Sequence, residues 1–325
     1  MSQTTAPTHD ALAGLSVFER GWLSSNNLLV HPAPGEPGAV LIDSGHVNHA
    51  AQTVALVTHA LHGTPLLRVV NTHLHSDHCG GNAALAQATG AQVSVPPGQA
   101  ADMQQWHVPT LSHWQTGQRL GRFEVQATLG AGDVLVAGGR EWQVLAAPGH
   151  DPHSVMLFDA AHGLLLSADA LWEHGFGIVF PELSGEPGFD DVAAVLDAIA
   201  ALPVRLVVPG HGAPFADVDA ALARARQRVA GMKADPVRHA QHGLRVLLKY
   251  HLMEEGSQDL TALLQWATSA PLLAEMWQRF APAGGAGVAG VVRADEWVLQ
   301  ALEDLASKGA LRREVRDGVD WVVDA

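Results

Sequence analysis

The stretch "NTHLHSDHCGGN", residues 71–82, places three histidines and one aspartate within six residues and then continues into two glycines. His73 and His75 are two residues apart, so their side chains face the same way if the segment is extended. Asp77 and His78 follow after the chain has begun to turn, which lets them point toward a second ion. The stretch therefore predicts a compact loop that presents metal ligands on two sides.

The flanking segments predict that this loop joins a strand to a helix. "LLRVV", residues 66–70, is short, apolar and β-rich, as is typical of a buried strand. Gly80 and Gly81 are expected to begin a helix that Gly90 ends, before a strand over residues 91–95. Upstream, "AVLIDSG" predicts a strand that ends at Asp43. A helix is expected next, because apolar residues recur at helical spacing: Val47, Ala51, Val54, Thr58 and Leu61.

The downstream sequence predicts hairpins followed by further helices. "DVLVAGGREWQVLAAPGH" should turn at Gly138-Gly139, and "SVMLFDAAHGLLLSADA" should turn near His162-Gly163. A helix is expected over residues 189–202, then a strand in "VRLVVPGHG" and a long helix around residues 216–232. Two sheet-forming halves that alternate with helices indicate a layered α/β sandwich.

Three further ligand candidates stand where a predicted strand opens into a loop: His150, Asp169 and His211. Aspartate is common in ordinary turns, but the place of Asp169 directly after an apolar strand favours a ligand role. Histidine nitrogens and carboxylate oxygens without a cysteine suit borderline cations such as Zn²⁺. An incompletely filled metal shell also leaves room for water and a substrate.

The order H-x-H-x-D-H, then His, Asp and His, resembles that of the metallo-β-lactamase-fold hydrolase superfamily over roughly residues 15–215. The resemblance implies a four-layer αββα sandwich with two metals along one edge. It implies that one metal is bound by His73, His75 and His150 and the other by Asp77, His78 and His211. It further implies that Asp169 bridges the two metals with a shared hydroxide, and that Asp43 supports the ligand loop from behind.

We therefore expect a dinuclear metal-dependent hydrolase that acts on a small acyl substrate such as an ester, thioester or lactone. The two divalent ions are expected to be Zn²⁺, with iron or manganese as alternatives. They would lower the pKa of a shared water from 15.7 to about 7. The resulting hydroxide would attack the carbonyl, with Asp169 holding both metals and Asp77 or a bound water returning the proton.

Other activities of the same fold stay open at this point. One is a mononuclear iron sulfur dioxygenase, and another is a phosphodiesterase or single-strand RNA nuclease. Aspartate at position 169 argues against the large class of zinc β-lactamases that has cysteine there, and His75 argues against di-iron flavoprotein reductases, which have glutamate. "PGHGAPFADV" lacks the longer motif that follows the last ligand in the glyoxalase II type. A non-catalytic binding role is disfavoured because every ligand position is filled.

The substrate contacts are expected in "LWEHGFGIVFPELSGEPGFD", residues 171–190, which is long for a simple connection. Its predicted cavity-facing residues are Trp172, Glu173, His174 and Phe176, and the alternative is a surface loop held by aromatic packing. Residues 96–117 are expected to form a helix or flap beside the site. Cys79 follows a ligand directly, yet a small buried packing role suits it better than catalysis.

The C-terminal third has a different pattern, with three predicted helices and a closing hairpin over Asp317-Gly318. This outline resembles the winged-helix domain of the lactamase-like-2 group, and it predicts domains over residues 1–234 and 235–325. From Val237 to Ala325 there are nine basic and twelve acidic residues, which is a poor footprint for nucleic acid. A packing, dimerising or cavity-completing role is favoured, so a homodimer stays open.

The bulk composition agrees with a folded protein that acts on small molecules. The chain has 325 residues and a formal net charge of −14, which repels polyanions. No apolar run approaches the ~18 to 20 residues that span a bilayer. "MSQTTAPTHDALAGL" lacks the features of a signal peptide, and the single cysteine agrees with a reducing compartment, so the cytoplasm is expected.

Overall fold

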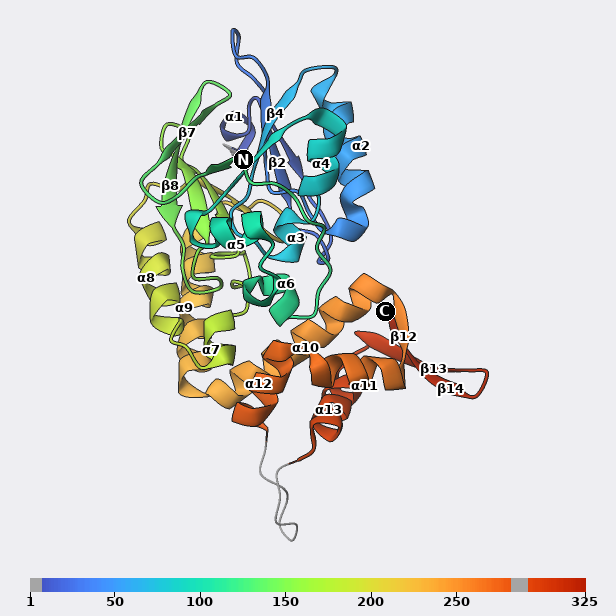
Figure 1. The fold of residues 1–325 in the computed structure, drawn as a ribbon. Coiled ribbons are helices and arrows are strands. Elements are labelled where there is room, and N and C mark those ends of the chain that lie inside the picture. Colours follow the sequence, from blue (N-terminus) through green and yellow to red (C-terminus); the bar gives the residue numbers. More distant parts are fainter. Residues whose placement is uncertain (1–7, 282–291) are drawn as a thin grey trace, which may run out of the picture.

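A computed structural model describes residues 8–281 and 292–325, so the first residues of the stretch searched for a signal peptide lie outside it. Two sheets form its centre (Figure 1). The first sheet has the order β1 (Leu15–Phe18), β2 (Asn27–Val30), β3 (Ala39–Ile42), β4 (Leu66–Val70), β5 (Gln92–Val95) and β6 (Ala127–Thr128). The second has the order β11 (Leu206–Pro209), β10 (Leu164–Ala168), β9 (Val155–Asp159), β8 (Arg140–Ala146) and β7 (Val134–Ala137).

The two sheets pack face to face through the largest apolar side chains of the protein's centre. Trp142 on β8 is fully buried and lies in one cluster with Val30 of β2 and Ile42 of β3. Strands β2, β3 and β9 to β11 are almost wholly buried, which explains their predominantly apolar sequences. Both predicted hairpins of the second sheet are confirmed, since β7 pairs with β8 and β9 with β10 in antiparallel register.

Helices cover the outer face of each sheet (Figure 1). The outer face of the first sheet packs against α2 (Ala50–Leu61) and α4 (Asn82–Thr89) through Val57, Leu61 and Leu85. The outer face of the second packs against α8 (Phe189–Ala200) and α9 (Val218–Ala234) through Leu196, Ile199 and Leu222. The helix–sheet–sheet–helix order confirms the predicted four-layer αββα sandwich. No helix among residues 8–281 and 292–325 is both long and apolar enough to cross a membrane.

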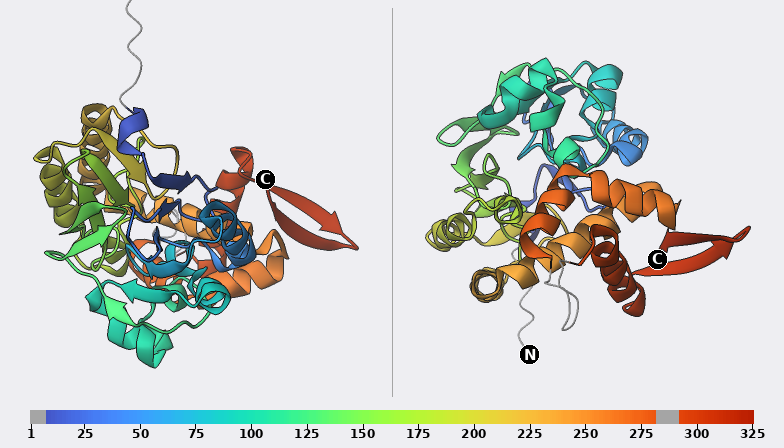
Figure 2. Two further views of the ribbon diagram at one scale, coloured as in Figure 1. Left: turned by 90° about the horizontal axis from the view of Figure 1, so that it is seen from above. Right: turned by 60° about the horizontal axis from the view of Figure 1, so that its bottom comes forward.

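The C-terminal elements form a separate apolar core beneath the sandwich (Figure 2). They are α10 (Pro236–Glu255), β12 (Ser257–Asp259), α11 (Leu260–Ser269), α12 (Pro271–Phe280), α13 (Ala294–Ser307), β13 (Leu311–Arg316) and β14 (Val319–Asp324). The predicted closing hairpin is present as β13 and β14. Helix α9 ends at Ala234, and α10 begins at Pro236. Asp235 lies between them and caps α10, because its side chain accepts a hydrogen bond from Arg238 N. The domain division and the winged-helix assignment stay predictions.

The helix predicted to begin at the two glycines of the opening stretch is confirmed, with Gly81 as the N-cap of α4 and Gly90 as its C-cap. Residues Ser76–Cys79 form a short helix, α3, and α4 starts at Asn82. A Cβ on Gly80 would lie 2.3 Å from Val47 N, and one on Gly81 would lie 2.4 Å from Ser44 O. These glycines are needed because the chain after β3 passes directly against them.

His239 on α10 makes the stability of the protein depend on pH. Its side chain is buried against Phe189, with ring centres 5.1 Å apart, and burial together with Arg228 lowers the pKa of His239 to about 4. The unfolded chain, with a pKa near 6.5, binds more protons as the pH falls from about 6.5 to 4, so folding is weakened across that window. We expect His239→Gln to remove on the order of 2 kcal/mol of this acid destabilisation. Urea unfolding of both proteins at pH 7.5 and 5.0 measures it; an equal pH slope in the two would contradict the assignment.

Candidate metal centre

Four strand ends bring the predicted ligands together at one edge of the sandwich. The loop after β4 carries the opening stretch, and the turn after β8 carries His150. Asp169 directly follows β10, and His211 lies two residues beyond the end of β11. Gly210 leaves room there, because a Cβ at this position would lie 2.2 Å from Asp169 Oδ1. Two groups of side chains result: His73, His75 and His150, and Asp77, His78, Asp169 and His211.

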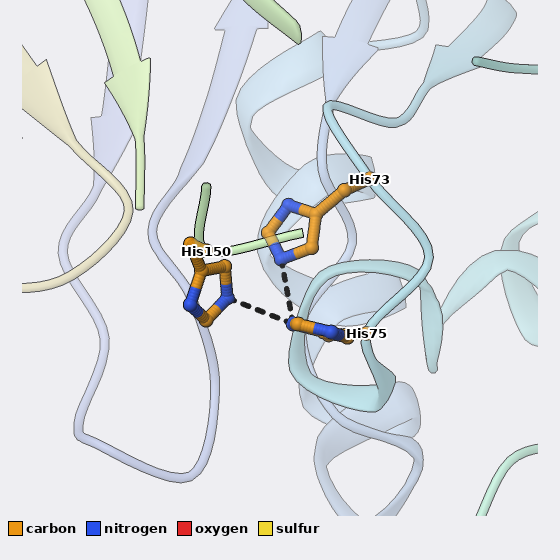
Figure 3. A group of neighbouring side chains, drawn as sticks. All are labelled: His73, His75 and His150. Carbon is orange, nitrogen blue, oxygen red and sulfur yellow. Dashed lines mark hydrogen bonds between the residues drawn. The ribbon is translucent and has the colours of Figure 1, made fainter. Parts of the chain in front are cut away.

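The first group is a set of three buried imidazoles whose nitrogens converge (Figure 3). His73 Nε2 lies 3.0 Å from His75 Nδ1, and His75 Nδ1 lies 2.8 Å from His150 Nε2. Burial and the neighbouring rings hold the pKa of His73 well below its usual range and lower that of His75 to about 4. All of these features favour neutral rings, which is the form that binds metals.

The proton positions on these rings follow from their outer contacts. His150 Nδ1 must donate to the carbonyl of Ile178 at 2.6 Å, which leaves a lone pair on Nε2. Thr72 Oγ1 donates to Asp43 Oδ2, so it accepts from His73 Nδ1 at 3.1 Å, and His73 Nε2 also keeps a lone pair. Two lone pairs thus meet at His75 Nδ1, which has at most one proton to donate. A cation between the three nitrogens satisfies all of them.

The second group contains a buried nitrogen with no hydrogen-bond partner. His78 Nδ1 donates to Asp43 Oδ2 at 2.8 Å, while His78 Nε2 is buried, has no hydrogen-bond partner among residues 8–281 and 292–325, and faces Asp169 Oδ1 at 3.4 Å. Burial opposes protonation of His78, but the surrounding carboxylates outweigh it and raise the pKa of this ring well above its usual value when no cation is bound. His211 Nε2 lies 3.0 Å from Asp77 Oδ2. Burial opposes ionisation of Asp77, but His78 and His211 outweigh it and lower the pKa of this carboxyl to about 2. The group therefore offers ionised carboxylate and imidazole ligands.

Asp169 lies between the two groups, with one oxygen toward each. Its Oδ2 is 3.2 Å from His150 Nε2 of the first group. Its Oδ1 is 3.4 Å from His78 Nε2 and 3.9 Å from His211 Nε2 of the second. This arrangement is the one that a carboxylate bridging two cations requires.

Asp43 supports the ligand loop from behind. Its Oδ1 accepts from Thr72 N at 2.9 Å, and its Oδ2 accepts from both Thr72 Oγ1 and His78 Nδ1. The residue has a left-handed backbone, with φ of 56°, at the end of β3. The contacts with His78 fix which ring nitrogen points into the site.

A cavity of about 600 Å³ opens beside the two groups. Of the residues predicted to face it, Trp172 and Phe176 line it, and Trp172 Nε1 donates to Asp169 Oδ1 at 3.2 Å. Glu173 and His174 do not line it: their side chains are 47% and 81% exposed. The prediction for these two residues was wrong because Trp172 and Gly175 bridge to each other and turn the residues between them outward.

The remaining cavity wall comes from residues that sequence analysis did not single out. Trp22 stacks on His211, with ring centres 5.3 Å apart. Tyr250 of α10 places its hydroxyl 3.1 Å from Ser76 Oγ inside the ligand loop. Thr116, which belongs to the segment predicted as a helix or flap, and Gln118, which follows that segment, also line the cavity. That segment consists of short helices, among them α5 (Ala100–Gln105) and α6 (Ser112–Gln115).

Cys79 is buried, and its Sγ donates to the carbonyl of His75 at 3.2 Å. Burial, together with the charges of Asp77 and Asp43, raises the pKa of the thiol well above its usual range. A neutral thiol is a poor nucleophile and a poor metal ligand, so these contacts agree with the packing role predicted for it.

Comparison with known proteins places this site in a wider context. A family model described as the metallo-beta-lactamase superfamily matches residues 20–211. Hydroxyacylglutathione hydrolase of Rhodobacter capsulatus is 37% identical over 149 residues, which are 45% of this chain and 48% of that enzyme. Hydroxyacylglutathione hydrolase of Anaeromyxobacter dehalogenans is 32% identical over 219 residues, 65% of this chain and 74% of that enzyme. The chain thus spans about half of the first relative's length and about three quarters of the second's.

A solved structure is similar over nearly the whole chain. It is that of a metallo-beta-lactamase family protein from Thermus thermophilus, with a TM-score of 0.54 and 22% identity. The match covers 95% of this chain and 98% of that one. Similarity at this level concerns the fold alone, and it extends into the C-terminal region.

Proposed function

This chain belongs to the metallo-beta-lactamase superfamily, and on that premise we propose that it is a hydrolase that uses two divalent cations to cleave a small acyl substrate. His73, His75 and His150 would hold one cation, and Asp77, His78 and His211 the other, with Asp169 shared. Zn²⁺ suits this set of nitrogen and oxygen ligands, and iron or manganese would also fit.

The observation that carries the proposal is the convergence of buried ring nitrogens whose hydrogen-bonding needs the described residues do not meet. Two lone pairs meet at His75 Nδ1, and His78 Nε2 is buried without a partner. Buried polar atoms of this kind are rare unless a ligand satisfies them. Asp169 directs one oxygen to each group, as a shared ligand would.

The chemistry of such a pair of cations is to polarise the scissile carbonyl and to lower the pKa of water to about 7. The protein's own residues hold and protect the reacting groups. Asp43 fixes the orientation of His78, and the carbonyl of Ile178 fixes that of His150. Asp77, which is ionised and lies at the cavity surface, is placed to accept a proton and return it to the leaving group. Trp22 and Trp172 limit the access of bulk water around His211.

Among acyl substrates, a thioester is favoured by the relatives. Both relatives described above are named hydroxyacylglutathione hydrolase, and an acylglutathione is a thioester. The sequence argument against the glyoxalase II type concerned the residues after His211. The similarity to these relatives therefore supports thioester cleavage, while the C-terminal region, which lines much of the cavity, can set a different substrate.

Metal analysis with a substrate panel tests this proposal. We expect about two metal ions per chain and hydrolysis of thioesters ahead of oxygen esters, lactones, phosphodiesters and a cephalosporin. One iron per chain with oxygen uptake would instead favour a sulfur dioxygenase. Preference for a phosphodiester would favour a nuclease or phosphodiesterase.

Asp43→Asn should weaken metal binding without removing a ligand. An amide can donate to Thr72 or His78 where the carboxylate accepts, so the orientation of His78 is lost. Substitution of a residue that hydrogen-bonds to a metal ligand typically lowers metal affinity by about 10- to 100-fold. Competition with a chromogenic chelator measures it, and Asp191→Asn, an exposed change on α8, is the control. Unchanged affinity in Asp43→Asn would show that the loop is held by other contacts.

The C-terminal region is proposed to complete the substrate cavity. Arg245, Val246, Lys249 and Tyr250 of α10 all line it. His46 Nε2 of the sandwich lies 3.0 Å from Glu254 Oε1 of α10, and both side chains are buried, so the helix is tied to the sandwich. We further propose a small-molecule substrate rather than nucleic acid, and a cytoplasmic location.

A further inference from the structure

The cavity wall that comes from the last third of the chain is cationic, although the chain as a whole carries a formal net charge of −14. Its basic members are Arg228 of α9, Arg245 and Lys249 of α10, and Lys308 at the end of α13. The acidic residues that line the cavity are Asp77 and Asp169, and both belong to the metal groups. Bound cations would make the interior more positive still.

Three of these four basic residues already have carboxylate partners. Lys249 Nζ lies 2.6 Å from Asp324 Oδ1. Arg245 Nη1 and Lys308 Nζ share Asp304, at 3.3 and 3.0 Å from its Oδ2. Lys249 therefore has a carboxylate of its own, whereas Arg245 and Lys308 share a single one.

Arg228 is different, since within residues 8–281 and 292–325 no carboxylate pairs with it. Its Nη2 donates to His242 Nε2 at 3.0 Å, and its guanidinium lies 5.4 Å from the centre of the Phe176 ring. His242 can accept because burial and the Arg228 charge lower its pKa to about 4, which keeps the ring neutral. A guanidinium has five N–H donors, so donors remain for a ligand. The ring and His242 hold the group in place without neutralising it.

We propose that Arg228 is the anion-binding residue of this cavity, and that the substrate carries a carboxylate or a phosphate in addition to its scissile acyl bond. This inference rests on the proposed function and narrows its substrate class. A guanidinium binds either anion through charge-assisted hydrogen bonds. A partly buried arginine without an acidic partner favours an anionic ligand over a neutral one.

Arg228 lines the same cavity as residues of both metal groups. Phe176 lies under the guanidinium, and the next residue, Gly177, donates its N–H to the carbonyl of Asp169 at 2.9 Å. The cavity volume of about 600 Å³ lies within the range of small-molecule sites. Its apolar lining residues, which would contact the uncharged part of the substrate, include Ile178, Phe180, Val246 and Met253. An anion bound at Arg228 would thus fix one end of the substrate, while the scissile carbonyl of the substrate lies near Asp169.

The test compares four thioesters on the metal-loaded full chain. The neutral reference is S-acetyl-N-acetylcysteamine. S-succinyl-N-acetylcysteamine adds a carboxylate to the acyl part, S-acetylglutathione adds carboxylates to the thiol part, and acetyl-coenzyme A adds phosphates there. For Arg228→Gln we expect KM to rise about 10- to 100-fold for at least one anionic thioester and to change less than about 2-fold for the neutral one. Arg228→Lys should recover part of the loss.

Arg226→Gln on the same helix is the matched control, because Arg226 is exposed and pairs with Asp197 at 2.7 Å. The anionic thioester whose KM responds identifies the group that is recognised. An equal change for all four thioesters, or none for any, overturns the proposal. If the wild type cleaves no thioester, the proposed function fails, and calorimetric titration with glutathione and coenzyme A decides separately about Arg228. Weaker binding of either compound to Arg228→Gln than to wild type supports the subsite; equal binding, or no binding to either protein, overturns it.

Discussion

Replacement of Asp169 by alanine is expected to lower hydrolysis by about 10³-fold or more, which corresponds to about 4 kcal/mol of transition-state stabilisation. The two carboxylate oxygens face different groups, Oδ2 toward His150 and Oδ1 toward His78. If Asp169 is shared by two cations as proposed, alanine removes a ligand from both of them and increases their mutual repulsion. The variant should therefore also retain less than one metal ion per chain, which elemental analysis measures after gel filtration.

The control for this prediction is Asp190→Ala, since Asp190 is exposed on α8 and pairs with Lys233 at the surface. It should keep full activity and full metal content. Circular dichroism separates a loss of ligand from a loss of fold. Turnover of Asp169→Ala equal to that of wild type would rule out the shared-ligand mechanism.

The candidate ligands could be singled out in the sequence because each follows the predicted end of a strand. The opening stretch follows a strand of five apolar and basic residues, and His150, Asp169 and His211 all follow the end of a strand. His150, Asp169 and His211 follow strands of one sheet, whereas the opening stretch follows β4 of the other. Their assignment to one site therefore came from the resemblance to the metallo-β-lactamase fold and not from strand positions alone. The hairpin turns at Gly138-Gly139 and His162-Gly163 were predictable from the local sequence, since turn residues act locally.

Most residues that line the substrate cavity could not be predicted, because their positions depend on contacts between elements that are distant in the sequence. Arg228 and Tyr250 are ordinary helix residues in the sequence, and they reach the cavity only because α9 packs against the second sheet and α10 packs beneath the sandwich. Gly80 and Gly81 were correctly predicted to lie at a helix start, but the close approach of the chain at Ser44, which requires glycine there, could not be predicted. The Glu173 side chain points away from the cavity because Trp172 and Gly175 form a β-bridge, which could not be predicted from the sequence.

Removal of the metals by a chelator is expected to lower the melting temperature by about 5 to 10 °C as well as to abolish hydrolysis. Ligands that bind only the folded state stabilise it by about 2.7 kcal/mol at 100 times their dissociation constant. For a domain of this size, 1 kcal/mol corresponds to about 2–4 °C. Without cations, the lone pairs of His73 and His150 are again opposed at His75, and His78 Nε2 is again buried without a partner.

Differential scanning fluorimetry before and after treatment with a chelator, and again after Zn²⁺ is restored, measures this effect. Asp190→Ala should show the full shift, whereas Asp169→Ala should show a much smaller one, because it begins with less metal. The shift should also shrink at pH 5.5, where protons compete with cations for the histidine nitrogens. If the chelator leaves the melting temperature unchanged at both pH values, the converging nitrogens of His73, His75 and His150 hold no cation. The hydrolase proposal would then lose its main physical support.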